Sequence, residues 1–212
     1  RLGVTGDARI SRKADSFAVL PEVQPLVTPY ELRLEVPGRP DLVARGTVRR
    51  SQWDGLVFPW QRDPIADLEG WRGDASRFGV PFRRFGLLLP FGEKGPSDGL
   101  LGPLRRQSGI PADRFGLIAS TELDFPAGRW KLIVRSDDGV RVLMDGVVVL
   151  EDWSIHAPRE QIHEFTVDRL RRIPVEVEYF EQTGFATLDV DFAWVGPLDD
   201  ADPDPDPAAT DG

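Results

Sequence analysis

The chain has 212 residues, of which 41% are hydrophobic, and it contains no cysteine. This hydrophobic content is enough for a folded core, and the absence of cysteine excludes disulfides, thiolate catalysis and cysteine-ligated metal sites. The 21 glycines and 19 prolines argue against a helical bundle and favour short strands joined by tight turns.

The net charge of −9 is concentrated at the C-terminal end of the chain. Residues 199–212 include six acidic residues and no basic one, whereas residues 1–198 have 29 acidic and 26 basic residues. A nearly neutral body lacks the broad basic surface that nucleic acids and anionic membranes require. No run of about 18 apolar residues is present, so we also expect no membrane insertion.

The N-terminal part of the chain gives the weakest pattern. Residues 30–36 and 42–49 alternate apolar and polar side chains on either side of Pro37-Gly38-Arg39-Pro40, which predicts a hairpin. We therefore assign residues 1–45 to an N-terminal segment that forms a hairpin or the edge of an upstream domain. The chain starts at Arg1 without a leader-like segment, so we expect it to be a piece of a longer protein.

One short helix and one long loop are predicted in the next part of the chain. Asp63-Pro64 suits an N-cap followed by the first helical position. Apolar residues then follow at three- and four-residue spacing, namely Ile65, Leu68, Trp71 and Ala75. Residues 86–112 are dominated by glycine, proline and small polar residues, which predicts a long loop.

From residue 115 onward the pattern is that of strands. We predict strands at 115–122, 130–135, 140–144, 147–150, 162–167, 173–180 and 185–194, with a type I′ turn at Asp145-Gly146. Strands of this number and length predict an all-β protein, an antiparallel β-sandwich or barrel with one short helix and long loops. We assign residues 46–197 to this domain and the alternating Asp/Pro segment 198–212 to an acidic linker.

Several motifs in this region resemble one family. They are Gly128-Arg129-Trp130, Ser136-Asp137-Asp138-Gly139-Val140-Arg141, Asp145-Gly146, Asp152-Trp153 and Val177-Glu178-Tyr179-Phe180-Glu181. Together they make residues 110–195 similar to the fourteen-kilodalton domain first described in anthrax protective antigen, the PA14 domain, in its bacterial form. The resemblance implies an antiparallel β-barrel or sandwich, found in multidomain secreted or cell-surface proteins and often binding carbohydrate.

The resemblance also implies candidate site residues. In fungal adhesin members, consecutive aspartates at this position hold a calcium ion that bridges to sugar hydroxyls, so Asp137 and Asp138 are the metal candidates. Trp153 and His156 follow the strand 147–150 and would lie near such an ion if the hairpin turns back. We therefore expect Asp137, Asp138, Trp153 and His156 to form a ligand-binding site.

Simpler interpretations of the same residues stay open. The segment Ser136 to Gly139 also suits a plain turn, in which aspartate side chains accept backbone N–H groups and Gly139 has a positive φ. Trp153 equally suits a buried position that closes the end of the barrel. The acidic residues on strands, including Asp189, Asp191 and Glu181, are expected on solvated faces without the burial that tunes a catalytic carboxyl group.

The function expected from these observations is that of a noncatalytic module of a larger bacterial protein, extracellular or on the cell surface. Its partners would be a glycan or another surface component, with calcium as a cofactor, and the neighbouring domains of its own chain. A structural spacer or assembly domain without a ligand is the alternative, and an accessory domain of a secreted glycoside hydrolase is a further one. No nucleophile or phosphate-loop motif is present, so no catalytic residue is predicted.

Overall fold

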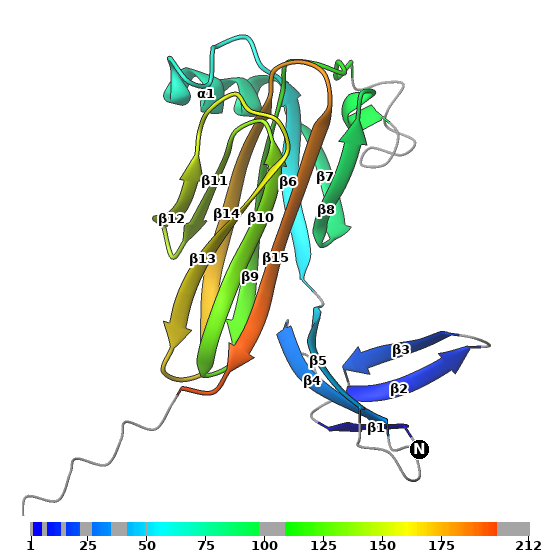
Figure 1. Ribbon diagram of the computed structural model, residues 1–212. Coiled ribbons are helices and arrows are strands. Elements are labelled where there is room, and N and C mark those ends of the chain that lie inside the picture. Colours follow the sequence, from blue (N-terminus) through cyan, green and yellow to red (C-terminus); the bar gives the residue numbers. More distant parts are fainter. Residues whose placement is uncertain are drawn as a thin grey trace, which may run out of the picture.

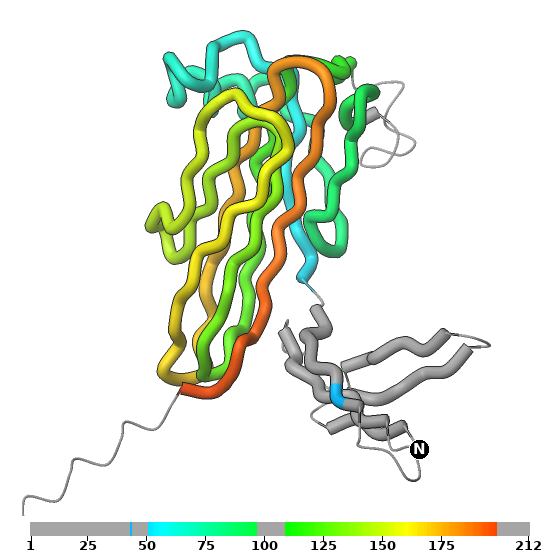
Figure 2. Tube along the Cα trace, viewed as in Figure 1, coloured from blue at the N-terminus to red at the C-terminus, as the bar shows by residue number. Residues whose placement is uncertain are grey.

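The computed structural model describes residues 51–97 and 109–198, together with the backbone of five N-terminal strands; Figure 2 shows in colour the residues whose side chains are described. The N-terminal strands are β1 (Leu2–Thr5), β2 (Ala8–Lys13), β3 (Ser16–Pro21), β4 (Val27–Leu34) and β5 (Leu42–Arg49). β4 pairs with β5 and β1, and β2 pairs with β3, all antiparallel. The hairpin predicted at 30–49 is thus confirmed. The predicted linker from residue 199 onward lies outside the described residues.

Two antiparallel sheets form a sandwich (Figure 1). The four-stranded sheet has the order β13-β10-β15-β8, and the six-stranded sheet has the order β12-β11-β14-β9-β6-β7. The strands are β6 (Gln52–Pro59), β7 (Val80–Phe85), β8 (Leu87–Gly92), β9 (Phe115–Phe125), β10 (Gly128–Asp137), β11 (Val140–Met144), β12 (Val147–Asp152), β13 (Arg159–Val167), β14 (Arg171–Glu181) and β15 (Ala186–Gly196). The predicted all-β sandwich is confirmed.

Alternating side chains fill the space between the two sheets. In β15 the residues Leu188, Val190 and Phe192 are buried, whereas Asp189 and Asp191 lie on the opposite, outer face. The same alternation in the other strands joins both sheets in one continuous apolar core. Each sheet therefore has one face in the core and one face available to solvent or to other elements.

The helix α1 (Leu68–Phe78) covers part of the outer face of the six-stranded sheet (Figure 1). It buries a second apolar cluster, formed by Phe58, Trp60, Trp71, Ala75 and Phe180. The predicted helix start was wrong: the N-cap is Asp67, whose carboxylate accepts the Gly70 N–H at 2.9 Å. Asp63 instead accepts the Ile65 N–H at 2.8 Å in a turn before the helix. No helix among the described residues has the length and apolar character needed to cross a membrane.

The prediction of a loop throughout 86–112 was also wrong, because β8 occupies Leu87–Gly92. Leu87 and Leu89 are buried in the core, while Pro90 points outward. Among the described strands β8 pairs with β15 alone, at the edge of the sheet, and an edge strand tolerates a proline that lacks an N–H group. The short 3₁₀ helix η1 (Gly95–Ser97) follows, and residues 98–108 lie outside the described part.

Candidate functional site

The Asp137-Asp138 dipeptide lies where the chain passes from one sheet to the other. Asp137 ends β10 and pairs with Thr187 of the four-stranded sheet, and Val140 begins β11 and pairs with Tyr179 of the six-stranded sheet. The peptide bond between the two aspartates is cis. The dipeptide is therefore held at the end of the sandwich that also carries α1 (Figure 1).

A third acidic side chain joins the pair. Glu181 is the last residue of β14, and its carboxylate has an oxygen within 4.8 Å of oxygens of both Asp137 and Asp138. All three residues are buried. The expectation of a solvated Glu181 was wrong. Its position two residues after Tyr179, in phase with the buried residues of β14, was the signal that places it on the inner face. We call Asp137, Asp138 and Glu181 the carboxylate cluster.

Burial and mutual repulsion disfavour the charged forms of the cluster. Desolvation, followed by the charge of Asp138, raises the pKa of Asp137 to about 6. Desolvation and the charges of both aspartates raise the pKa of Glu181 to about 8. Among the described residues, no lysine or arginine forms an ion pair with any of the three. In the described part of the chain the cluster thus lacks a lysine or arginine partner, and the charge of the nearby His156 lowers the pKa of Asp137 without offsetting the two larger effects.

Hydrogen bonds to the cluster come from two loops and from strand β14. The two carboxylate oxygens of Asp138 accept the backbone N–H groups of His156 and Gln182, each at 2.9 Å. The buried Tyr179 hydroxyl donates to the Asp137 carbonyl, and it lies 3.4 Å from Glu181 Oε2. Glu181 Oε1 is buried without a hydrogen-bond partner. The cluster therefore connects the loop after β12 with the loop after β14 and leaves at least one acceptor oxygen unsatisfied.

The interpretation of this segment as a local turn is only partly correct. Asp138 does accept backbone N–H groups, but they belong to distant loops rather than to its own turn. Gly139 is not among the glycines with positive φ. A Cβ at this position would overlap the ring of Phe180, so glycine is required here by close approach rather than by backbone conformation.

The comparisons with known proteins agree with this geometry at the level of fold. No model of a protein family and no curated protein matches the sequence. Among solved structures, the PA14 domain of the MpAFP antifreeze protein is 16% identical with a TM-score of 0.53, over 70% of this chain and 86% of that chain. The described sandwich has the PA14 fold.

Two further solved structures have a similar fold and belong to longer chains. An anti-sigma factor domain-containing protein is 17% identical with a TM-score of 0.51, over 69% of this chain and 44% of that chain. Another, from Clostridium clariflavum, is 14% identical with a TM-score of 0.50, over 70% of this chain and 43% of that chain. At such low identity, the likeness establishes the PA14 fold alone.

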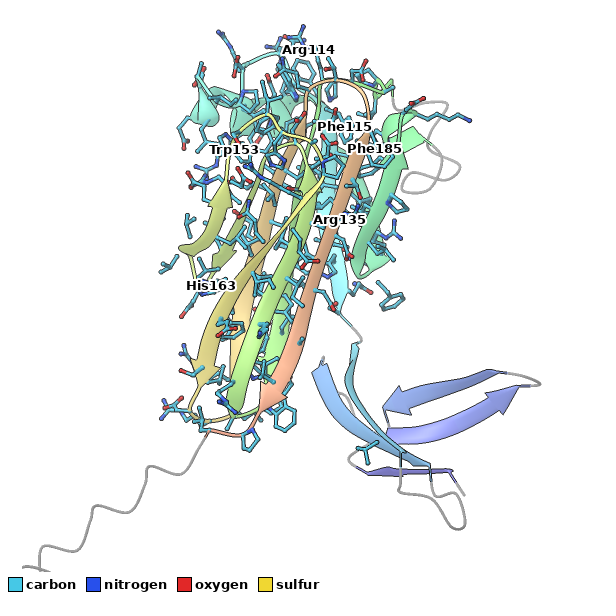
Figure 3. The ribbon with its side chains drawn as sticks, in the orientation of Figure 1. Arg114, Phe115, Arg135, Trp153, His163 and Phe185 are labelled. Carbon is cyan, nitrogen blue, oxygen red and sulfur yellow. The ribbon has the colours of Figure 1, made fainter. Side chains whose placement is uncertain are left out.

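Of the two other predicted site residues, His156 contacts the cluster, whereas the described contacts of Trp153, labelled in Figure 3, are with the apolar cluster beneath α1. The Trp153 ring makes edge contacts with Trp71 and Phe180 at 5.2 and 4.8 Å between centroids, and its Nε1 donates to the Pro64 carbonyl at 2.7 Å. His156 contacts Asp138 with its backbone, while its ring Nδ1 lies 2.9 Å from the carbonyl oxygen of Ala157. Their contact with a ligand stays a prediction.

Exposed side chains border the loops that hold the cluster. Ile155, which precedes His156, is 57% exposed, and Phe185, the last residue of the loop between β14 and β15, is 49% exposed. Figure 3 shows Phe185 and Arg114 at the same end of the sandwich as Trp153. Polar oxygens next to exposed apolar side chains are the combination that suits a sugar ring, which has hydroxyls and an apolar face.

The residues of the cluster fit a hard divalent cation such as calcium. Ca²⁺ takes about six to eight oxygen ligands, and three carboxylates provide oxygen donors only. Each Asp138 oxygen that accepts one N–H group keeps a second lone pair for a metal. Three carboxylates do not complete the coordination, so water or hydroxyl groups of a ligand would supply the other oxygens.

A groove of about 620 Å³ elsewhere on the molecule is not part of this site. It lies on the outer face of the six-stranded sheet, and its lining includes Gln52, Asp54, Ser120 and Glu176. The carboxylate of Asp54 is already paired with Arg83 across β6 and β7. The groove shares no residue with the carboxylate cluster.

Proposed function

We propose that this chain is a noncatalytic, lectin-like module that binds a glycan at the loop end of its PA14-type sandwich, with calcium held by Asp137, Asp138 and Glu181. The observation that carries the proposal is the cluster itself: three buried carboxylates with oxygens within 4.8 Å of one another, without a lysine or arginine ion-pair partner among the described residues. The module would act outside the cell or on the surface of a bacterium, as part of a longer protein.

Elementary electrostatics supports a cation at this position. Burying several like charges costs free energy unless a counter-charge compensates them, and a divalent cation is the compact counter-charge that carboxylate oxygens accept. A bound cation of this kind would keep coordination positions open for pairs of sugar hydroxyls. The exposed Phe185 and Ile155 would then cover the apolar face of the sugar.

The decisive experiment is a calcium titration of the wild type and of Asp137→Asn. Asn has nearly the shape of Asp but lacks its charge. The Asp137 side chain makes no hydrogen bond with another described residue, so the substitution removes the charge without breaking such a bond. Calcium at about 100 times its Kd should stabilise the wild type by about 2.7 kcal/mol, or about 5–10 °C in Tm for a chain of this size. Asp137→Asn should lose most of this shift.

The matched control is Asp145→Asn. Asp145 lies in the turn between β11 and β12 with a φ of 53°, a conformation that Asn also adopts, and it is exposed. Its response to calcium should equal that of the wild type. The same proteins, incubated on a glycan array with calcium or with a chelator, test the second half of the proposal. An unchanged Tm of the wild type with calcium would exclude the metal site, and an array without any bound glycan would exclude the lectin-like function.

One observation favours the structural alternative, in which the domain is a spacer or assembly module. Asp138 already connects two loops through the N–H groups of His156 and Gln182, which is a sufficient reason for a buried carboxylate. In that case Asp138→Asn should lower the stability equally with and without calcium. Under the proposed function, the loss should be larger when calcium is present.

A further inference from the structure

Arg114 is held firmly beside the loops of the cluster by its backbone. Its N–H donates to the carbonyl of Gln182, and its own carbonyl accepts the Trp60 N–H, both at 3.1 Å. Its φ of 58° places it in the left-handed region, which directs the side chain differently from an extended strand residue. The position of Arg114 is thus determined by two segments that are distant from it in sequence.

The side chain of Arg114 is exposed and carries a charge that no described carboxylate neutralises. Its guanidinium carbon lies 4.6 Å from the centroid of the Trp60 ring, a cation–π contact that orients the group without using its N–H donors. The neighbouring Asp113 does not pair with it, since its carboxylate accepts the Gly184 N–H at 2.9 Å. Among the described residues, the five guanidinium N–H donors of Arg114 have no hydrogen-bond partner and remain for a ligand.

Three other arginines near this end of the sandwich are paired with carboxylates. Arg72 and Arg141 both contact Glu178, at 2.6 and 2.8 Å, and Arg159 pairs with Asp152. Their donors are used within the fold. Arg114 differs from these three because its aromatic contact orients the guanidinium, while no described residue hydrogen-bonds to its N–H groups.

Gln182 connects the backbone of Arg114 to the carboxylate cluster. Gln182 accepts the Arg114 N–H with its carbonyl and donates its own N–H to the Asp138 carboxylate. Trp60, on which Arg114 stacks, donates its Nε1–H to the carbonyl of Glu181 at 3.0 Å. Arg114 is therefore connected to the cluster through Gln182 and, by its contact with Trp60, through the neighbouring Glu181.

We propose that Arg114 is a specificity residue that makes this site prefer acidic glycans, those with a uronate carboxylate, over their neutral counterparts. The inference rests on the proposed function and adds a ligand class to it. Guanidinium and carboxylate form two parallel hydrogen bonds of matching geometry, and an arginine already oriented by an aromatic ring loses less side-chain freedom when it binds. The glycan's hydroxyls would contact the cluster, and its carboxylate would contact Arg114.

The test compares each acidic glycan with its carboxyl-reduced form. The probes are a trimer of galacturonic acid and a hyaluronan tetrasaccharide, measured by calorimetry with the full chain in the presence of calcium. We expect the wild type to bind at least one acidic form about tenfold more tightly than its reduced form. Arg114→Asn should abolish this preference, since Asn tolerates a left-handed backbone but lacks the charge.

Two further variants separate charge from fold. Arg77→Asn removes another exposed arginine with a cation–π contact, at 5.0 Å from the Phe78 ring, but on α1 rather than in the loops, and should keep the preference. Arg114→Lys should retain part of it, because lysine keeps the charge and loses the paired geometry. The Tm of Arg114→Asn, measured with calcium alone, should stay within a few degrees of the wild type.

The outcomes distinguish this inference from the proposed function. Equal binding of acidic and reduced forms by the wild type, or an unchanged preference in Arg114→Asn, would overturn the role of Arg114 and leave the glycan site intact. Binding of neutral glycans alone would also overturn the role of Arg114 and leave the glycan site intact. If no glycan of either kind binds, both the proposed function and this inference are wrong.

Discussion

Replacing Glu181 with glutamine tests the electrostatics of the cluster most directly. The change conserves the size of the side chain and removes a charge that burial opposes. In the calcium-free protein, desolvation and the neighbouring aspartates raise the pKa of Glu181 from 4.5 to about 8. The folded protein therefore holds this proton up to about pH 8, whereas the unfolded chain releases it near its ordinary pKa.

The sign of the pH dependence follows from this difference in proton binding. Between about pH 4.5 and pH 8 the folded state binds more protons than the unfolded state, so the free energy of unfolding decreases as the pH rises. A pKa raised from 4.5 to about 8 corresponds to a loss of up to about 5 kcal/mol across this window. Glu181→Gln should lack this contribution and should be more stable than the wild type above about pH 8.

The assay is urea unfolding in the presence of a chelator, at about pH 5 and about pH 8.5. These two pH values include most of the range over which the proton of Glu181 affects the stability. The control is Glu122→Gln on the exposed face of β9. Its free energy of unfolding should differ from that of the wild type by the same small amount at both pH values. Calcium should reverse the order of stability at high pH, because the variant lacks one carboxylate ligand. A wild type whose stability does not fall between the two pH values, or a variant no more stable at the higher one, would refute the reasoning.

Three further substitutions test the packing around the cluster by urea unfolding. Tyr179→Phe removes the buried donor to the Asp137 carbonyl and should cost about 1–2 kcal/mol, and no loss would mean that the hydroxyl has another role. Gly139→Ala should cost about 1–3 kcal/mol, because its Cβ would overlap the Phe180 ring; a neutral effect would show that the ring moves aside easily. Glu178→Gln should cost about 3 kcal/mol, since it removes the buried charge that pairs with both Arg72 and Arg141, and a change below about 0.5 kcal/mol would contradict that.

Local signals in the sequence predicted most of the sandwich correctly. The alternation in β15 identified its buried face, and Asp145-Gly146 was recognised as a hairpin turn, with φ values of 53° and 76° at the two residues. β8 was missed because Gly86 and Pro90 indicate a loop, whereas pairing with β15 and burial of Leu87 make the segment a strand. A propensity is a weak preference that tertiary contacts override.

For the candidate site, Asp137 and Asp138 were predicted because the segment Ser136 to Arg141 resembles a motif of the PA14 family. Glu181 was not predicted as a site residue, although the period-two pattern of β14 placed this residue in phase with buried neighbours. Only the tertiary structure brought the carboxylate of Glu181 to the aspartates and the backbone of Gln182 and His156 to Asp138. The physical reason is that strand periodicity depends on residues that are consecutive in the sequence, whereas the distance between loops depends on how two sheets pack against each other.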